Sequence, residues 1–255
     1  MKLFSLLMAG LSALCCVSGA QAAGLFDAPL AHEHLPLERD PVNPQAEAWL
    51  DCIVHPGFVV KQVDRGEVGA ERLAITRLAP GQKAPACRVA PARGERTIPE
   101  SDGAGYFMGV KGRFAFFESA DGFNGGSYLL VYDALNFRKL HEALIERLEA
   151  VELTGPAPAT GLRLRYRAMH LADCSLRQDL AGCWAVIQRL TGLQGDAPDC
   201  AAAYEQLEND LPPERRADAA ADPSVVGYTL EALIDPAGRI ERKVLPGKLE
   251  CWPAE

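Results

Sequence analysis

Short apolar runs, separated by glycine, proline and charged turns, recur along the chain from Trp49 onward. Valine, isoleucine, tyrosine and phenylalanine dominate these runs, and bounded runs of this composition predict β-strands. The clearest run covers 162–168, where apolar residues alternate strictly with arginine, as in a strand with one buried face. The pattern predicts further strands at 53–54, 58–63, 72–75, 106–110, 113–118, 128–132, 225–234 and 239–245.

Turn signals lie between several of these runs and indicate antiparallel hairpins. Lys111-Gly112 is compatible with a tight hairpin turn, and 121–126 has the sequence Asp-Gly-Phe-Asn-Gly-Gly. Asp235-Pro236-Ala237-Gly238 predicts a turn in a final hairpin. We therefore expect antiparallel sheets in a sandwich-like arrangement.

Two short helices are predicted in the last third of the chain. The first runs from an N-cap at Ser175 to about residue 193 and carries an apolar stripe at helical spacing. The second opens at 198–199 and continues to about residue 207. The segment 137–151 is ambiguous, because its leucines recur at helical spacing while its closeness to the preceding strand also permits a hairpin.

Three segments differ in composition from these elements. Residues 23–48 carry four prolines and little periodicity, which predicts an arm kept out of helix and sheet. Residues 79–100 and 212–223 are rich in loop-forming residues.

From the predicted strands and helices together, we expect a single β-rich α+β domain over residues 49–255, with the two short helices packed on its sheets.

The first 22 residues have the regions of a secretory signal peptide. Lys2 precedes an apolar run, and Ala20-Gln21-Ala22 forms a small-residue site that predicts cleavage between Ala22 and Ala23. The apolar run is too short for a membrane span, and no later stretch is long enough to be one. We therefore expect a protein without a transmembrane segment that is exported to the periplasm or secreted.

Export would bring six cysteines into an oxidising compartment, where disulfides form and persist. Two more cysteines, Cys15 and Cys16, lie in the predicted leader. Six cysteines allow 15 pairings, and the sequence does not select one of them. Joining neighbours gives the simplest hypothesis, namely Cys52–Cys87, Cys174–Cys183 and Cys200–Cys251.

The formal net charge is −8. An acidic chain lacks the positive field that nucleic acids and anionic membranes attract, so neither is an expected partner. The sequence identifies no particular partner, and an envelope protein and an anionic glycan are the two candidates.

Arg163, Arg165 and Arg167 stand out in this acidic chain. On a strand they would lie on one face about 7 Å apart, where parallel guanidinium groups can hold a carboxylate, sulfate or phosphate. The alternative is a solvated face paired with acids such as Glu149 or Glu152 on an adjacent segment. The three arginines are the leading candidates for an anion site.

Two other groups resemble metal ligands only weakly. In the 121–126 turn, Asp121 and Asn124 offer oxygen atoms for calcium, but these ligands are too few, and a turn at Asn-Gly explains the residues better. His32 and His34 would share a face of an extended chain, yet they lie in the proline-rich arm without an evident further ligand. We expect no metal at either place. His55, His141 and His170 are isolated and are expected to be surface or hydrogen-bonded residues.

Catalytic and cofactor signatures are lacking. No GxSxG elbow surrounds a serine, and the glycine pattern at 103–109 has its last glycine one residue too late for a dinucleotide fingerprint. We expect no cofactor. A non-enzymatic binding or envelope-accessory role is the first functional hypothesis, and a secreted hydrolase with a carboxylate-based site is the alternative.

Several motifs resemble those of a group of uncharacterised exported bacterial proteins of unknown function. They are the runs 105–112, 121–126 and 131–134, together with Ala172-Asp173-Cys174-Ser175-Leu176 and Cys183-Trp184. The resemblance implies export and a β-rich fold, and it implies no catalytic residue.

Overall fold

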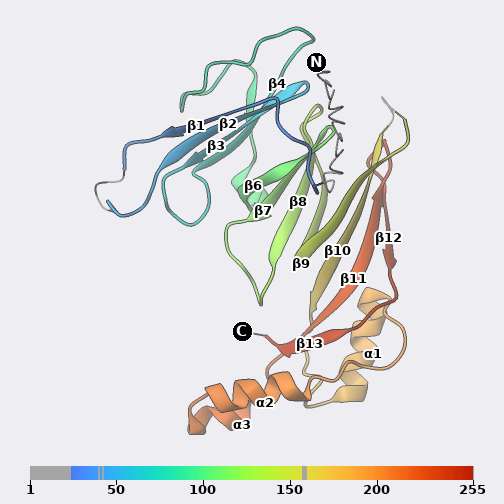
Figure 1. The fold of residues 1–255 in the computed structure, drawn as a ribbon. Helices are drawn as coiled ribbons and strands as arrows, with labels where there is room; N and C mark the ends of the chain where they lie inside the picture. The colour runs from blue at the N-terminus through green and yellow to red at the C-terminus, as the bar shows by residue number, and fades with distance from the viewer. Residues whose placement is uncertain (1–23, 40, 42, 157–159, 255) are drawn as a thin grey trace, which may run out of the picture.

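The computed structural model describes residues 24–39, 41, 43–156 and 160–254 (Figure 1). The predicted leader, with its cleavage point between Ala22 and Ala23, lies outside the described residues. Two antiparallel sheets and two short helices make up most of the fold, so the predicted β-rich α+β class is confirmed.

The first sheet has five antiparallel strands in the order β1-β2-β3-β4-β5. We call it the small sheet, and it lies at the upper left of Figure 1. Its strands are β1 (Ala31–Pro36), β2 (Trp49–His55), β3 (Phe58–Asp64), β4 (Arg72–Arg77) and β5 (Glu95–Thr97).

The second sheet, the large sheet, has the strand order β12-β11-β10-β9-β8-β7-β6, with β13 paired to β11. Consecutive strands are joined as antiparallel neighbours, as the turn signals predict. Its strands are β6 (Ala104–Lys111), β7 (Phe114–Ser119), β8 (Ser127–Asp133), β9 (Arg138–Thr154), β10 (Gly161–Leu171), β11 (Ser224–Ile234), β12 (Ile240–Val244) and β13 (Glu250–Pro253).

Strands β7 and β8 are buried on both faces, because each face enters a different core. The large core lies within the large sheet and under the helices, and the middle core is shared between the large sheet and the small sheet. On β7, Phe116 lies in the large core and Phe117 lies in the middle core. On β8, Val131 lies in the large core and Leu130 lies in the middle core. Burial on both faces explains why these strands read as continuous apolar runs rather than as alternating ones.

The large sheet curls so that the starts of β7 and β9 approach the turn between β11 and β12. The Arg113 guanidinium, at the start of β7, donates to the carbonyl of Pro236 at 3.2 Å, and Arg138 donates to that of Ala237 at 2.8 Å. Both acceptors lie in the turn between β11 and β12. The register of β9 against its neighbours shifts at several points, and such bulges bend a strand.

The helices lie at the lower end of the large sheet (Figure 1). They are α1 (Leu180–Thr191), α2 (Ala201–Asp210) and the one-turn α3 (Arg216–Ala219); two short 3-10 turns, Glu100–Asp102 and Pro213–Arg215, complete the described helical segments. The helix predicted from Ser175 begins later, since Asp179 caps α1 by accepting from the amide of Gly182 at 3.0 Å. The Ser175 hydroxyl donates instead to the carbonyl of Ala220 at 2.6 Å.

Two expectations about local structure need correction. The helical alternative for 137–151 is wrong, because this segment is strand β9, paired with both β8 and β10. The expectation that prolines keep 23–48 out of a sheet is wrong for β1. Pro36 ends that strand, and β1 is an edge strand, where proline is tolerated.

Three disulfides brace the fold, and they join the pairs that the neighbour hypothesis names. Cys52–Cys87 holds the loop before β5 against the small sheet, and Cys174–Cys183 ties the end of β10 to α1. Cys200–Cys251 ties the start of α2 to β13. Within the described residues, no helix has the length and hydrophobicity needed to cross a membrane.

Candidate metal centre

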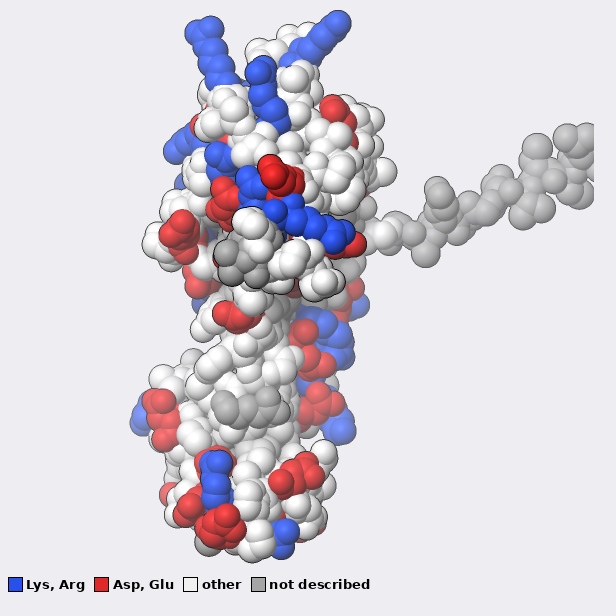
Figure 2. Space-filling model, turned by 90° about the vertical axis from the view of Figure 1, so that its left-hand side faces the viewer, with Lys and Arg blue, Asp and Glu red and all other residues white. Residues whose placement is uncertain are grey.

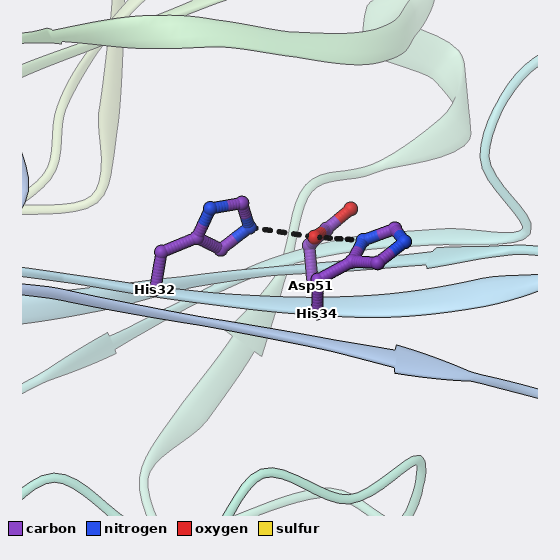
Figure 3. A group of neighbouring side chains, drawn as sticks. All are labelled: His32, His34 and Asp51. Atoms are coloured by element: carbon purple, nitrogen blue, oxygen red, sulfur yellow. Dashed lines mark hydrogen bonds and ion pairs between the residues drawn. The ribbon is translucent and has the colours of Figure 1, made fainter.

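Asp51 lies between two imidazole rings on the small sheet (Figure 3). Its Oδ1 atom is 2.7 Å from Nε2 of His32 and 2.8 Å from Nδ1 of His34. One potential ligand atom from each of the three side chains lies within 4.8 Å of the other two. Within the described ranges, this is the one group of at least three histidine, cysteine or acidic side chains close enough to share a metal ion.

The β-sheet register produces this convergence. His32 and His34 are two residues apart on β1 and therefore share a face of the strand. In the antiparallel pairing of β1 with β2, Asp51 lies directly opposite His34 and diagonally opposite His32. The backbone pairing thus brings the carboxylate next to both rings.

The three side chains remain accessible to solvent to different degrees. The His32 and His34 side chains are 47% and 60% exposed, whereas that of Asp51 is 13% exposed. The carboxylate therefore forms the floor of the site and the two imidazoles form its open rim. In the structure the carboxylate accepts hydrogen bonds from both rings, so the charge that would neutralise a cation is already in position.

Sequence reasoning identified His32 and His34 but rejected them because it found no further ligand. The missing ligand, Asp51, comes from the next strand, 17 residues beyond His34. An alternating histidine pair followed by an acid in the next strand-forming run is the signal that could have revealed the site. It was hidden by the prolines, which predicted an arm without a strand.

The three arginines of β10 are paired with acids. Arg163 lies 3.4 Å from Glu152, and Arg165 lies 3.3 Å from Glu149, as in the paired alternative. Figure 2 likewise shows basic and acidic side chains side by side over the upper and lower parts of the face that it presents. This pairing removes the reason to expect an anion at these arginines.

Arg167 was expected to face solvent beside Arg163 and Arg165, but its side chain is buried. Only 6% of its side chain is exposed, and a guanidinium nitrogen is 2.7 Å from the Glu250 carboxylate. It also donates to the carbonyl of Lys248 at 3.1 Å. The register shift between Arg167 and Ala168 accompanies this departure from simple in-and-out alternation.

The 121–126 segment is a turn. Phe123 and Gly126 exchange two backbone hydrogen bonds, of 2.6 and 3.0 Å, around Asn124 and Gly125, which both have positive φ. This geometry is that of the two-residue Asn-Gly hairpin turn. The carbonyl of Asn124 accepts from the indole of Trp252 at 3.0 Å, which joins the turn to β13.

The isolated histidines are buried or half-buried rather than exposed. His55 stacks on Phe58 with ring centroids 5.7 Å apart, and His141 is hydrogen-bonded to the Tyr166 hydroxyl at 3.0 Å. Burial lowers the pKa of His55, of His170 and, to about 4, of His141. None of the three belongs to the metal-ligand group of His32, His34 and Asp51.

Comparison of the chain with protein-family models, with curated protein sequences and with solved structures found no match. The resemblance to exported bacterial proteins therefore stays a prediction. Function has to be inferred from the chemistry of this chain.

Proposed function

We propose that the protein is an exported binding or envelope-accessory protein that binds a divalent transition-metal ion. The observation that carries this proposal is the convergence of His32, His34 and Asp51 on one point of the small sheet. On binding the ion, each imidazole would carry its proton on its other ring nitrogen, so that His32 Nε2, His34 Nδ1 and the Asp51 carboxylate become the ligands.

Ligand chemistry selects the class of ion. Imidazole suits zinc, copper and nickel, whereas calcium and magnesium prefer sets made of oxygen atoms. Two imidazoles and one carboxylate leave at least one coordination position of zinc open to water or another ligand. Zinc or copper(II) is therefore the expected ion, held at an accessible site that can also release it.

Export is part of the proposal. Three disulfides brace the described chain, and disulfides persist mainly in oxidising compartments such as the periplasm and the extracellular space. The leader-like first 22 residues support the same location.

The alternative, a carboxylate-based hydrolase, gains no support from the acids of the described chain. Such an enzyme needs one carboxyl group with a raised pKa to act as a general acid. Three acids have surroundings that clearly change their pKa, namely Asp27, Asp102 and Asp235, and in each case hydrogen bonds and nearby cations lower it.

The proposal predicts one zinc or copper(II) ion per chain, measured by isothermal titration calorimetry on oxidised protein that starts at residue 23. His34→Gln and Asp51→Asn should each weaken binding at least about tenfold, because each removes a ligand. Calcium and magnesium should produce no comparable heat.

Glu33→Gln is the matched control. Glu33 lies between the two histidines but pairs with Cys52 on the opposite face of β1, so its replacement should leave metal affinity unchanged. Absence of zinc and copper binding, or equal affinity in the wild type and in His34→Gln, would refute the proposal.

A further inference from the structure

A cavity lies against the large sheet, far in sequence from the candidate metal ligands. It has a volume of about 240 Å³ and opens between the C-terminal turn of α1 and strands β9 to β12. Polar and apolar atoms contribute equally to its lining, and the apolar part includes Leu144, Leu190 and Leu230. Its polar groups include Tyr166, Tyr228 and Arg242.

Arg242 differs from the arginines of β10 in its surroundings. Among the described residues, no carboxylate lies within 4 Å of its guanidinium, whereas Arg163, Arg165 and Arg167 are all paired with glutamates. Glu142 also lines the cavity, and its carboxylate is 2.9 Å from the ammonium of Lys139, which also pairs with Asp102 at 3.1 Å. Arg242 is exposed on β12 and therefore brings to the cavity a guanidinium that is outside the ion pairs of the described residues.

Two buried tyrosines accompany this arginine. Tyr166 is 1% exposed, and its hydroxyl is held by His141 at 3.0 Å. Tyr228 is 8% exposed and lies beside Tyr166 on the neighbouring strand. Burial raises the pKa of Tyr166 to about 12 and also raises that of Tyr228, so both hydroxyls keep their protons and can donate.

We propose that this cavity binds a small organic monocarboxylate with an apolar body. The carboxylate would lie against Arg242 and the Tyr228 hydroxyl, and the apolar body would fill the space between Leu144, Leu190 and Leu230. A guanidinium and a tyrosine hydroxyl are donors that suit a carboxylate, and the leucine side chains on the other side of the lining suit an apolar body. This proposal is independent of the metal site.

The size of the cavity limits the ligand. Its volume corresponds to about eight water molecules at 30 Å³ each, which is below the usual range for drug-sized ligands. A straight-chain acid of about eight carbons fits this limit, with each buried CH₂ contributing about 0.8 kcal/mol. A much longer chain would have to leave the cavity.

The test is calorimetric titration of the full oxidised protein with octanoate, and with its uncharged analogue octanamide. We expect octanoate to bind at least about tenfold more tightly than octanamide, and more tightly than either butyrate or hexadecanoate. Arg242→Gln should weaken octanoate binding at least about tenfold, while Tyr228→Phe should weaken it by a smaller factor.

Arg165→Gln is the matched control, because Arg165 is an exposed arginine of the same sheet, on β10, and is already paired with Glu149. It should bind octanoate as the wild type does, and so should the metal-ligand variant His34→Gln. Thermal melts of the unliganded variants check that each is folded. No binding at about 1 mM octanoate, or undiminished binding by folded Arg242→Gln, would overturn the proposal.

Discussion

His141 illustrates how one buried side chain ties the stability of this protein to pH. It is 2% exposed, and its Nε2 atom is hydrogen-bonded to the Tyr166 hydroxyl. Burial, helped by the nearby positive charge of Arg242, lowers its pKa from 6.5 to about 4. The imidazole is therefore neutral in the folded protein at neutral pH, and it fills the large core as a polar but uncharged group.

The low pKa of His141 predicts a loss of stability in mild acid. Between about pH 6.5 and pH 4 the unfolded chain binds a proton at this position and the folded chain does not, so the free energy of unfolding falls as the pH falls. The full effect is about 3 kcal/mol. Urea unfolding at a series of pH values, and an NMR titration of the His141 ring, would measure it.

The control is His141→Gln, which removes the titrating group. His55 and His170 also have lowered pKa values and titrate in both proteins, so only the difference between the two pH profiles reports on His141. Identical slopes below pH 6.5 would contradict the assignment.

Strand β10 shows that a regular alternating pattern can hold side chains with different roles. Arg163 and Arg165 are exposed and form surface ion pairs, which contribute little to stability. Arg167 is buried, and it links β10 to Glu250 of β13 and to the backbone of Lys248. These contacts hold the C-terminal segment against the large sheet.

Replacing these arginines should therefore have unequal effects. Arg167→Ala should lower the free energy of unfolding by about 2–4 kcal/mol, since it removes a buried charge-assisted network. Arg165→Ala should change it by less than about 1 kcal/mol. Urea denaturation of the two variants measures both values, and equal losses would show that the burial of Arg167 is unimportant for stability.

The whole molecule is layered from the small sheet through β7 and β8 to the long strands β10 and β11. The middle core joins the first two layers and the large core joins the last two. Strand β1 lies at the outer margin of this arrangement, with all six of its residues exposed. Stability should accordingly be greatest at the centre of the layers and smallest at β1.

Hydrogen exchange measured by mass spectrometry tests this gradient. We expect the slowest backbone amides in β7, β8, β10 and β11, and much faster exchange in β1, which has fewer buried contacts. Zinc should slow exchange in β1 in particular, because the ion would join this strand to β2. If, in the absence of metal, the amides of β1 exchange as slowly as those of β8, the predicted gradient is contradicted.

Local patterns in the sequence predicted most of the elements. The strict alternation at 162–168 predicted β10, and the turn residues at 121–126 and 235–238 predicted hairpin turns. These predictions succeed because side-chain alternation and turn geometry depend on residues adjacent in the chain. The β-rich class and the two short helices follow from the same local information.

Only the tertiary structure decided which side chains meet. Whether 137–151 formed a helix or a strand depended on its pairing with β8 and β10, and leucine spacing does not reveal that pairing. The metal ligands needed the register of β1 against β2, and the cavity at Arg242 needed the curl of the large sheet. Register and curvature arise from contacts between distant segments, so the candidate sites became visible only when the chain was folded.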